Sequence, residues 1–157
     1  MLAKFSNRVN SDERGFTLIE LLVVILIIGI LAAIALPAFL GQQNKGQDAD
    51  AKSAARNMVS QIESCFATNE DYTNCTDTVL TQAQTGLNVG TASAGQVHIS
   101  GQSTTGYTVT AWSKSGTDFS IIKAGSGSIT RHCQLHGSAV TATDAANKGG
   151  CKADSSW

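Results

Sequence analysis

One charged side chain, Glu20, interrupts a long apolar segment near the start of this 157-residue chain. From residue 16 to residue 40, only Thr17 and Glu20 have polar side chains. A charged group at the centre of a membrane-spanning helix costs about 2.5–3.5 kcal/mol, and less near its end, so such groups are usually retained for function. No Lys, Arg or His lies three or four residues from Glu20. We therefore expect its ionic partner to come from another molecule or from a newly made cation.

Four cysteines follow the apolar segment, namely Cys65, Cys75, Cys133 and Cys151. Four cysteines allow three disulfide connectivities, and the sequence alone does not choose among them. Zinc is disfavoured because no pair of cysteines or histidines at ligand spacing is backed by a second pair. His132 and His136 lie close to Cys133, but loop-forming residues follow them, and we interpret this cluster as incidental. Paired disulfides in an oxidising compartment are the better interpretation.

Patterns typical of catalytic sites are absent from the sequence. There is no glycine-rich phosphate loop, no G-x-S-x-G motif and no nucleophile with an adjacent base. Asp144 and Asp154 are too isolated to form a calcium site. Residues 41–157 contain eight Lys or Arg against nine Asp or Glu, which gives no clear sign of nucleic-acid binding. We expect no enzymatic activity, no catalytic residue, no cofactor and no metal.

The apolar segment has the length of a membrane-spanning helix. Residues 16–40 give a helix of about 37 Å at 1.5 Å per residue, against a hydrocarbon core of about 30 Å. Lys4, Arg8 and Arg14 precede it, so the positive-inside rule places the N-terminus in the cytoplasm and the cysteines outside. The alternatives are a plain signal anchor and a secretory signal peptide with an A-x-A site at residues 33–35. The apolar run is long for a signal peptide, and a signal anchor gives no reason for Glu20.

Beyond residue 40 the helix is expected to continue with an amphipathic pattern. Apolar residues recur there at steps of three and four, at Ala51, Ala55, Met58, Val59, Ile62, Cys65 and Phe66. Asp48, Lys52 and Glu63 fall largely outside this stripe. We predict one helix from about Phe16 to Thr68, whose second half packs against a sheet.

The rest of the chain predicts a loop and an antiparallel sheet. Residues 69–95 are expected to form a connecting loop with a short helix near 78–84. Alternating residues predict strands at 96–100, 107–113, 118–124 and 128–132. The turns between them are short, and short turns join antiparallel neighbours. The predicted fold class is α+β, a long N-terminal helix packed on a sheet of three or four antiparallel strands.

The residues around Glu20 resemble a known signature. The run Arg14-Gly15-Phe16-Thr17-Leu18-Ile19-Glu20-Leu21-Leu22, continuing to Gly29 and Pro37, is similar to the prepilin signature of type IV pilins and type II secretion pseudopilins. The similarity covers residues 14–40 closely and the remaining helix-then-strands layout loosely. Gly, Phe and Glu at this spacing, with a basic leader before and an apolar run after, rarely coincide otherwise.

The resemblance implies a processing site and an assembly site. Prepilin peptidase is expected to cut between Gly15 and Phe16 on the cytoplasmic side and to methylate the new Phe16 amine. That amine is the cation that Glu20 lacks, and Glu20 of a neighbouring subunit is expected to neutralise it and to set the axial register of assembly. Gly29 and Pro37 weaken a helix by about 1 and 3 kcal/mol relative to alanine. They mark either a tolerated kink or a stretch that unwinds as the filament packs.

Sequential pairing of the cysteines suits the predicted layout. Cys65 lies at the helix end and Cys75 in the loop that leaves it, while Cys133 ends the last strand and Cys151 lies in a Gly-rich tail. The bonds Cys65–Cys75 and Cys133–Cys151 are expected to close two loops that have little core of their own, and each contributes roughly 2–4 kcal/mol. The second bond also resembles the C-terminal disulfide loop of many pilins.

The expected organisation is a leader (1–15), a transmembrane and filament-core helix (16–40) and a soluble domain (41–157). The soluble domain comprises an amphipathic helix (41–68), a loop (69–95), a sheet (96–132) and a disulfide tail (133–157). The resemblance implies a structural subunit of a type IV pilus, cleaved, N-methylated and polymerised through its N-terminal helix. A type II secretion pseudopilin and a minor or DNA-uptake pilin are the alternatives.

The implied partners are other copies of the chain in a helical homopolymer, prepilin peptidase, a membrane assembly platform and, before assembly, the lipid bilayer. The implied location is a single-pass membrane protein with a cytoplasmic N-terminus before assembly, and an extracellular surface filament afterwards.

Overall fold

The computed structural model describes residues 15–82, 86–91, 93–135, 138–139, 150–152 and 154–157. The chain forms two compact units that divide between Ala38 and Phe39. The predicted leader lies outside the described residues except for Gly15, and so does much of the predicted disulfide tail, including His136.

Helix α1 (Leu18–Asn69) is the longest element. It begins two residues after, and ends one residue after, the limits expected from the sequence. The Asn69 side-chain amide donates to the Cys65 carbonyl at 3.0 Å, and the Glu70 N–H donates to the Phe66 carbonyl at 2.7 Å. Glu70 has φ of 53°. A left-handed residue at this position ends a helix by satisfying its last carbonyls.

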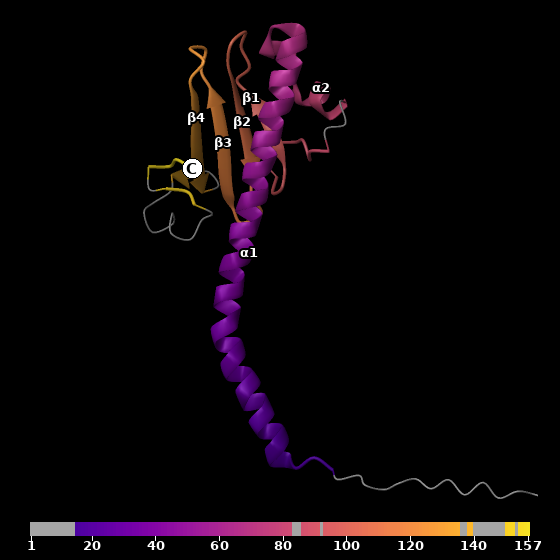
Figure 1. The fold of residues 1–157 in the computed structure, drawn as a ribbon, viewed down its shortest axis with the longest axis vertical. Coiled ribbons are helices and arrows are strands. Elements are labelled where there is room, and N and C mark those ends of the chain that lie inside the picture. Colours follow the sequence, from indigo (N-terminus) through magenta and orange to yellow (C-terminus); the bar gives the residue numbers. More distant parts are fainter. Residues whose placement is uncertain (1–14, 83–85, 92, 136–137, 140–149, 153) are drawn as a thin grey trace, which may run out of the picture. The chain divides into compact units, whose positions relative to one another are not determined.

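The sheet is an antiparallel meander of order β1-β2-β3-β4-β5 (Figure 1). Its strands are β1 (Val97–Ser100), β2 (Tyr107–Trp112), β3 (Thr117–Lys123), β4 (Ile129–Leu135) and β5 (Ser138–Ala139). The α+β class is therefore confirmed, and the four longer strands match the four expected ones.

Strand β4 and strand β5 differ from the sequence-based expectation. β4 was expected to end at His132 but continues to Leu135, so Cys133 lies inside the strand. The reason is cross-strand pairing, because Thr117 at the start of β3 is opposite Leu135. The partner strand, and not the local sequence of β4, sets its length. The two-residue strand β5 then extends the sheet into the region expected to be the disulfide tail.

The core lies between the second half of α1 and one face of the sheet. The helix contributes Ala51, Ala55, Met58 and Ile62, all buried, as the apolar stripe predicted. The sheet contributes alternate residues of three strands, namely Val97, Ile99, Tyr107, Val109, Ala111, Phe119 and Ile121. Two of the four helix residues are alanines, which allow the helix backbone to approach the sheet closely.

Asp48 is a correction to the predicted stripe. It was expected to lie largely outside the buried face, yet none of it is exposed. The hydroxyl of Ser115, in the turn between β2 and β3, donates to the Asp48 carboxylate. A buried carboxylate needs such a partner. The helical period alone could not reveal one that lies 67 residues away in the sequence.

Two short elements connect α1 to the sheet. The 3₁₀ helix η1 (Tyr72–Asn74) buries Tyr72, and helix α2 (Asp77–Gln82) lies near the short helix expected at 78–84. Asp77 joins α2 to β1, since its carboxylate accepts the Ile99 N–H at 3.0 Å and pairs with the His98 ring.

Candidate assembly site at the start of helix α1

Thr17 and Glu20 form a capping box at the start of α1. The Thr17 N–H and the Thr17 hydroxyl each donate to Glu20 Oε2 at 2.8 Å. In return, the Glu20 N–H donates to Thr17 Oγ1 at 3.3 Å. This reciprocal pattern satisfies backbone N–H groups that have no partner at a helix start.

The capping box gives Glu20 a local partner that sequence reasoning missed. The search for a partner considered only charged residues, whereas the T-x-x-E spacing was itself the signal of a cap. Thr17 is uncharged, so the box leaves the Glu20 charge uncompensated. It holds the Glu20 carboxylate against Thr17, at the start of the helix.

Gly15 and Phe16 lie before the helix. Both are exposed and neither has helical structure, and nothing lies within 4 Å of a Cβ placed on Gly15. Both residues are thus exposed ahead of a helix whose start is already capped by Thr17.

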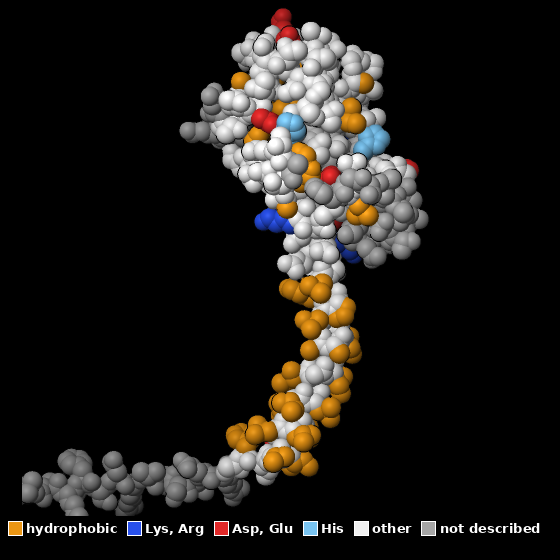
Figure 2. All heavy atoms as spheres, turned by 180° about the vertical axis from the view of Figure 1, so that it is seen from behind, with side chains coloured by type: hydrophobic (Ala, Val, Ile, Leu, Met, Phe, Trp, Pro, Cys, Tyr) orange, Lys and Arg blue, Asp and Glu red, His pale blue; other side chains and the backbone are white. Residues whose placement is uncertain are grey.

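The first unit presents apolar side chains on all sides of its helix. Phe16 is 82% exposed, Ile25 67% and Leu31 62%. Figure 2 shows hydrophobic side chains covering this part of α1. α1 is also the one helix among the described residues that is long and apolar enough to cross a membrane. Such a surface is unfavourable in water and requires a lipid or protein environment.

Gly29 and Pro37 both lie inside the continuous helix α1. Nothing lies within 4 Å of a Cβ placed on Gly29, so packing within this chain does not require a glycine there. The helix is not interrupted at Pro37. Whether this stretch unwinds in a filament stays a prediction.

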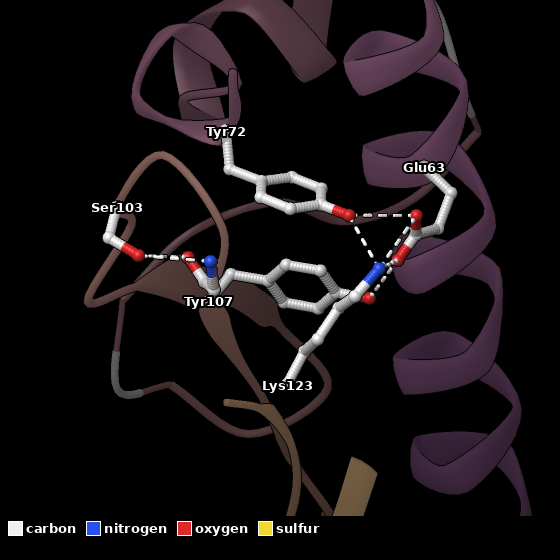
Figure 3. A network of polar contacts seen from close by, with 6 residues as sticks. Glu63, Tyr72, Ser103, Tyr107 and Lys123 are labelled. Atoms are coloured by element: carbon white, nitrogen blue, oxygen red, sulfur yellow. Dashed lines mark hydrogen bonds and ion pairs between the residues drawn. The ribbon is translucent and has the colours of Figure 1, made fainter. Parts of the chain in front are cut away.

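In the second unit, Glu63 is the centre of a polar network that joins the end of α1 to the sheet (Figure 3). Its carboxylate accepts the Tyr72 hydroxyl at 2.9 Å and the Tyr107 hydroxyl at 2.8 Å. Lys123 donates to both carboxylate oxygens and, at 2.6 Å, to the Tyr72 hydroxyl. Phe66 stacks on Tyr72 with ring centroids 4.3 Å apart. The network therefore fixes α1, η1, β2 and β3 to one another.

The network shifts the pKa values of its members in opposite directions. Burial on its own raises the pKa of the Glu63 carboxyl, but hydrogen bonds from Lys123, Tyr107 and Tyr72 outweigh it and lower the pKa below 4.5. Hydrogen bonding to Tyr72 and Glu63 raises the pKa of Lys123 above 10.5. Burial and the Glu63 carboxylate raise the pKa of Tyr107. Sequence reasoning did not single out this network, since its four members are far apart in the chain.

Both disulfides link the sequential pairs that were expected. Cys65 is bonded to Cys75 and Cys133 to Cys151, with a Cα–Cα distance of 6.0 Å in each. The first joins the end of α1 to the residue after η1. The second fastens the C-terminal segment to β4. Within the described residues there is no group of three or more potential metal ligands.

Comparison with known proteins bears on the first unit directly. Residues 10–36 match the family described as the prokaryotic N-terminal methylation motif. This range contains Gly15, Phe16 and the capping box of Thr17 and Glu20. The chain carries a prepilin-type methylation motif.

The curated relatives that match this chain are named as pilins or fimbrial proteins. The type IV major pilin protein PilA of Myxococcus xanthus is 41% identical over 68 residues, which is 43% of this chain and 31% of that protein. The type IV major fimbrial protein FimA of Dichelobacter nodosus is 40% identical over 65 residues, 41% of this chain and 42% of that protein. A fimbrial protein of Moraxella nonliquefaciens is 45% identical over 65 residues, 38% of this chain and 42% of that protein.

The matched region is thus between about a third and two fifths of the length of these relatives. No solved structure matches the chain.

Proposed function

We propose that this chain is a structural subunit of a type IV pilus, made as a prepilin and polymerised through its N-terminal helix. The observation that carries the proposal is an exposed apolar helix whose first turn holds one carboxylate, inside the methylation motif. The names of the relatives favour a major pilin over a secretion pseudopilin or a minor pilin.

The apolar helix suits two environments in succession. Before assembly, its exposed Leu, Ile and Val side chains are covered by lipid; after assembly, they are covered by the helices of neighbouring subunits. Moving a helix from lipid to a filament core gains little hydrophobic free energy, because lipid tails are as apolar as leucine. Close packing and polar contacts must therefore direct the assembly.

Glu20 is the polar group that suits this role. Cleavage after Gly15 creates a cationic amine at Phe16, and methylation of that amine keeps its charge. Glu20 of a neighbouring subunit neutralises this amine in the apolar core and so fixes the axial register. Leaving one member of a buried ion pair without its partner costs about 3–5 kcal/mol, so subunits in the wrong register are rejected.

The capping box is compatible with processing at Gly15. Cleavage leaves the Thr17 N–H and hydroxyl unchanged, so both still donate to Glu20 Oε2 in the mature chain. The basic leader and the positive-inside rule place the cut on the cytoplasmic side. Prepilin peptidase, a membrane assembly platform and further copies of the chain are the proposed partners.

The test is electron microscopy of the cell surface in a strain that lacks the gene and in the same strain complemented with it. Thin filaments that bind antibody against the second unit should be present only in the complemented strain. A complemented strain that contains cleaved protein in its membrane but no labelled filaments contradicts the proposal.

A further inference from the structure

The second unit contains a cavity of about 250 Å³ beside helix α1. One wall is formed by four residues of α1 at helical spacing, namely Gln47, Asp50, Ala51 and Ala54. The other walls come from three segments that are distant from α1 in the sequence, namely residues 86–88, 95–96 and 112–114. All of these residues belong to the second unit, so the cavity lies apart from the apolar part of the helix.

Hydrogen bonds hold the three segments against one another. The Gly95 N–H donates to the Trp112 carbonyl at 2.7 Å, and the Trp112 N–H donates to the Gln96 carbonyl at 2.9 Å. The Val97 N–H donates to the Asn88 carbonyl at 2.9 Å, and the Asn88 side-chain amide donates to the Gly95 carbonyl at 3.3 Å. The walls of the cavity are therefore fixed by the fold, as those of ligand sites usually are.

Gln96, which lines the cavity, has an unsatisfied acceptor. Its side-chain oxygen is buried and accepts no hydrogen bond from any residue that the structure describes. A buried acceptor without a donor costs stability and needs an explanation. A ligand in the cavity can supply the missing donor, which must be an O–H or N–H group.

Gly90 makes room for the Gln96 side chain. A Cβ placed on Gly90 lies 2.6 Å from Gln96 Nε2, which is closer than two such atoms can approach. The φ of Gly90 is not in the left-handed region, so its backbone conformation does not require glycine. The amide that lies against it explains the glycine instead. Two residues thus act together to place an amide whose oxygen lacks a partner among the described residues.

The charged residues of the cavity balance each other. Asp50 and Lys114 are both exposed, and neither forms an ion pair within the described part of the chain. Ionic contacts with exposed side chains contribute little to binding. The polar atom that a ligand must satisfy is therefore the uncharged Gln96 oxygen, with the amides of Gln47 and Asn88 nearby. Such a lining favours a neutral ligand that both donates and accepts hydrogen bonds.

The size and the apolar part of the cavity narrow the choice of ligand. Pockets for drug-sized ligands measure about 300–1,000 Å³, so this cavity suits a smaller molecule. Ala51, Ala54 and Leu87 give it an apolar surface beside the amides. A ring that carries hydroxyl groups at its edge and C–H groups on its faces matches both kinds of surface.

We propose that this cavity binds one uncharged sugar residue, with a sugar hydroxyl donating to Gln96 Oε1. The sugar is either free or the terminal residue of a glycan, since both present the same ring. The inference goes beyond the proposed function, because it requires the folded second unit and not a filament.

Saturation-transfer NMR of the purified full chain, in a detergent without a sugar head group, tests the proposal. The probes are glucose, galactose, mannose and N-acetylglucosamine, each as the free sugar and as its methyl glycoside. At least one should bind with a Kd of about 1–10 mM. Binding of the methyl glycoside identifies the terminal residue of a glycan, whereas binding of the free sugar alone identifies a monosaccharide.

Matched variants show whether the sugar occupies this cavity. Gln96→Met keeps the length of the side chain but removes its acceptor, and Gly90→Ala displaces the Gln96 amide through the added Cβ. Each should raise the Kd about tenfold. The double variant G90A/Q96M should bind no more weakly than Q96M, because both changes act on the same amide. Gln134→Met, at an exposed position of β4 outside the cavity, is the control and should bind as the wild type does.

The urea midpoint of unfolding, measured on the same samples, separates binding from folding. The midpoint of Q96M should equal or exceed that of the wild type, because this change removes a buried acceptor without a donor. G90A should keep the wild-type midpoint, because the flexible end of Gln96 moves away from the added Cβ. Weaker binding at an unchanged midpoint then shows that the cavity holds the sugar.

The outcomes that overturn the inference are distinct. Absence of binding by every sugar overturns it, and so does equal binding by the wild type and Q96M. Binding of free glycine or free lysine in place of the sugars, abolished by salt, identifies a zwitterionic ligand and also overturns it. Because these measurements use no filaments, a strain that lacks filaments contradicts the proposed function and leaves this inference standing.

Discussion

Lys123 donates to both carboxylate oxygens of Glu63, at 2.9 and 3.1 Å, and thereby connects the end of strand β3 to helix α1. The Tyr72 and Tyr107 hydroxyls donate to the same carboxylate. One partly exposed glutamate thus accepts hydrogen bonds from residues of three other elements. Because three elements share the Glu63 carboxylate, its removal should lower stability by more than the loss of a surface ion pair would.

Glu63→Ala should destabilise the second unit by about 2 kcal/mol, because it removes a charged acceptor from two buried tyrosine hydroxyls and from Lys123. Urea unfolding of the purified full chain in detergent, followed by near-UV circular dichroism, measures the effect. Ser64→Ala, at an exposed neighbouring position on α1, is the matched control and should change stability by less than about 0.5 kcal/mol. Equal stability of the two variants would mean that apolar packing alone holds α1 on the sheet.

The same network predicts how stability depends on pH. The pKa of Glu63 is lower in the folded state than its ordinary 4.5, so its contribution is present above pH 4.5 and is lost as the pH falls through the lower, folded value. The pKa of Lys123 is raised above 10.5, so its contribution is present below that pH and is lost as the pH rises through the higher, folded value.

The urea midpoint of unfolding, measured from pH 3 to pH 12, should therefore be constant at intermediate pH and decrease toward both the acid and the alkaline end. Glu63→Gln should flatten the acid limb relative to wild type and also weaken the alkaline limb, because Glu63 is one of the groups that raise the pKa of Lys123. If the acid limb is identical in wild type and Glu63→Gln, the loss of stability at low pH comes from other carboxylates.

Processing between Gly15 and Phe16 predicts a defined mass for the filament subunit. Intact-mass measurement should give a chain that begins at Phe16 and carries one additional methyl group. Gly15→Leu should yield an uncut precursor in the membrane, because the side chain obstructs the exposed bond before the helix. A mature chain that begins after Ala35 indicates signal-peptide cleavage and excludes this processing.

Glu20 offers a test that separates its charge from its capping role. Glu20→Gln retains an acceptor for the Thr17 N–H and hydroxyl but removes the charge, whereas Thr17→Val removes the capping hydroxyl but keeps the carboxylate. We expect E20Q to give normal levels of cleaved membrane protein with few filaments, and T17V to give filaments in near-normal amounts. Immunoblots of membranes beside micrographs of sheared material measure both. Near-normal filaments in E20Q together with few filaments in T17V would show that Glu20 acts through helix capping and not through its charge.

The elements with a strong local period could be predicted from the sequence. The spacing of Ala51, Ala55, Met58 and Ile62 indicated the buried face of α1, and the alternation in β2 indicated the buried Tyr107, Val109 and Ala111. In both, the period of the side chains belongs to the element itself. The capping box could also have been found, since Thr17 and Glu20 are three residues apart.

Features that depend on distant partners could not be predicted in this way. Asp48 is buried because Ser115 reaches it from a turn, and Glu63 is placed by residues of η1, β2 and β3. β4 is longer than its local pattern suggests because β3 pairs with all of it. Trp157 is placed by residues of β3 and α1, because its indole N–H donates to the Ser120 carbonyl and its ring contacts Arg56.

The meander has a consequence for how the second unit reaches its fold. Each strand pairs with the strand that follows it in the sequence, so the chain closes only short loops while the sheet forms. Local pairing of this kind allows fast folding, on the order of milliseconds. Disulfide formation takes seconds or longer. Oxidation of Cys65–Cys75 and Cys133–Cys151, and not the search for strand partners, therefore sets the time at which a newly made chain becomes fully stable.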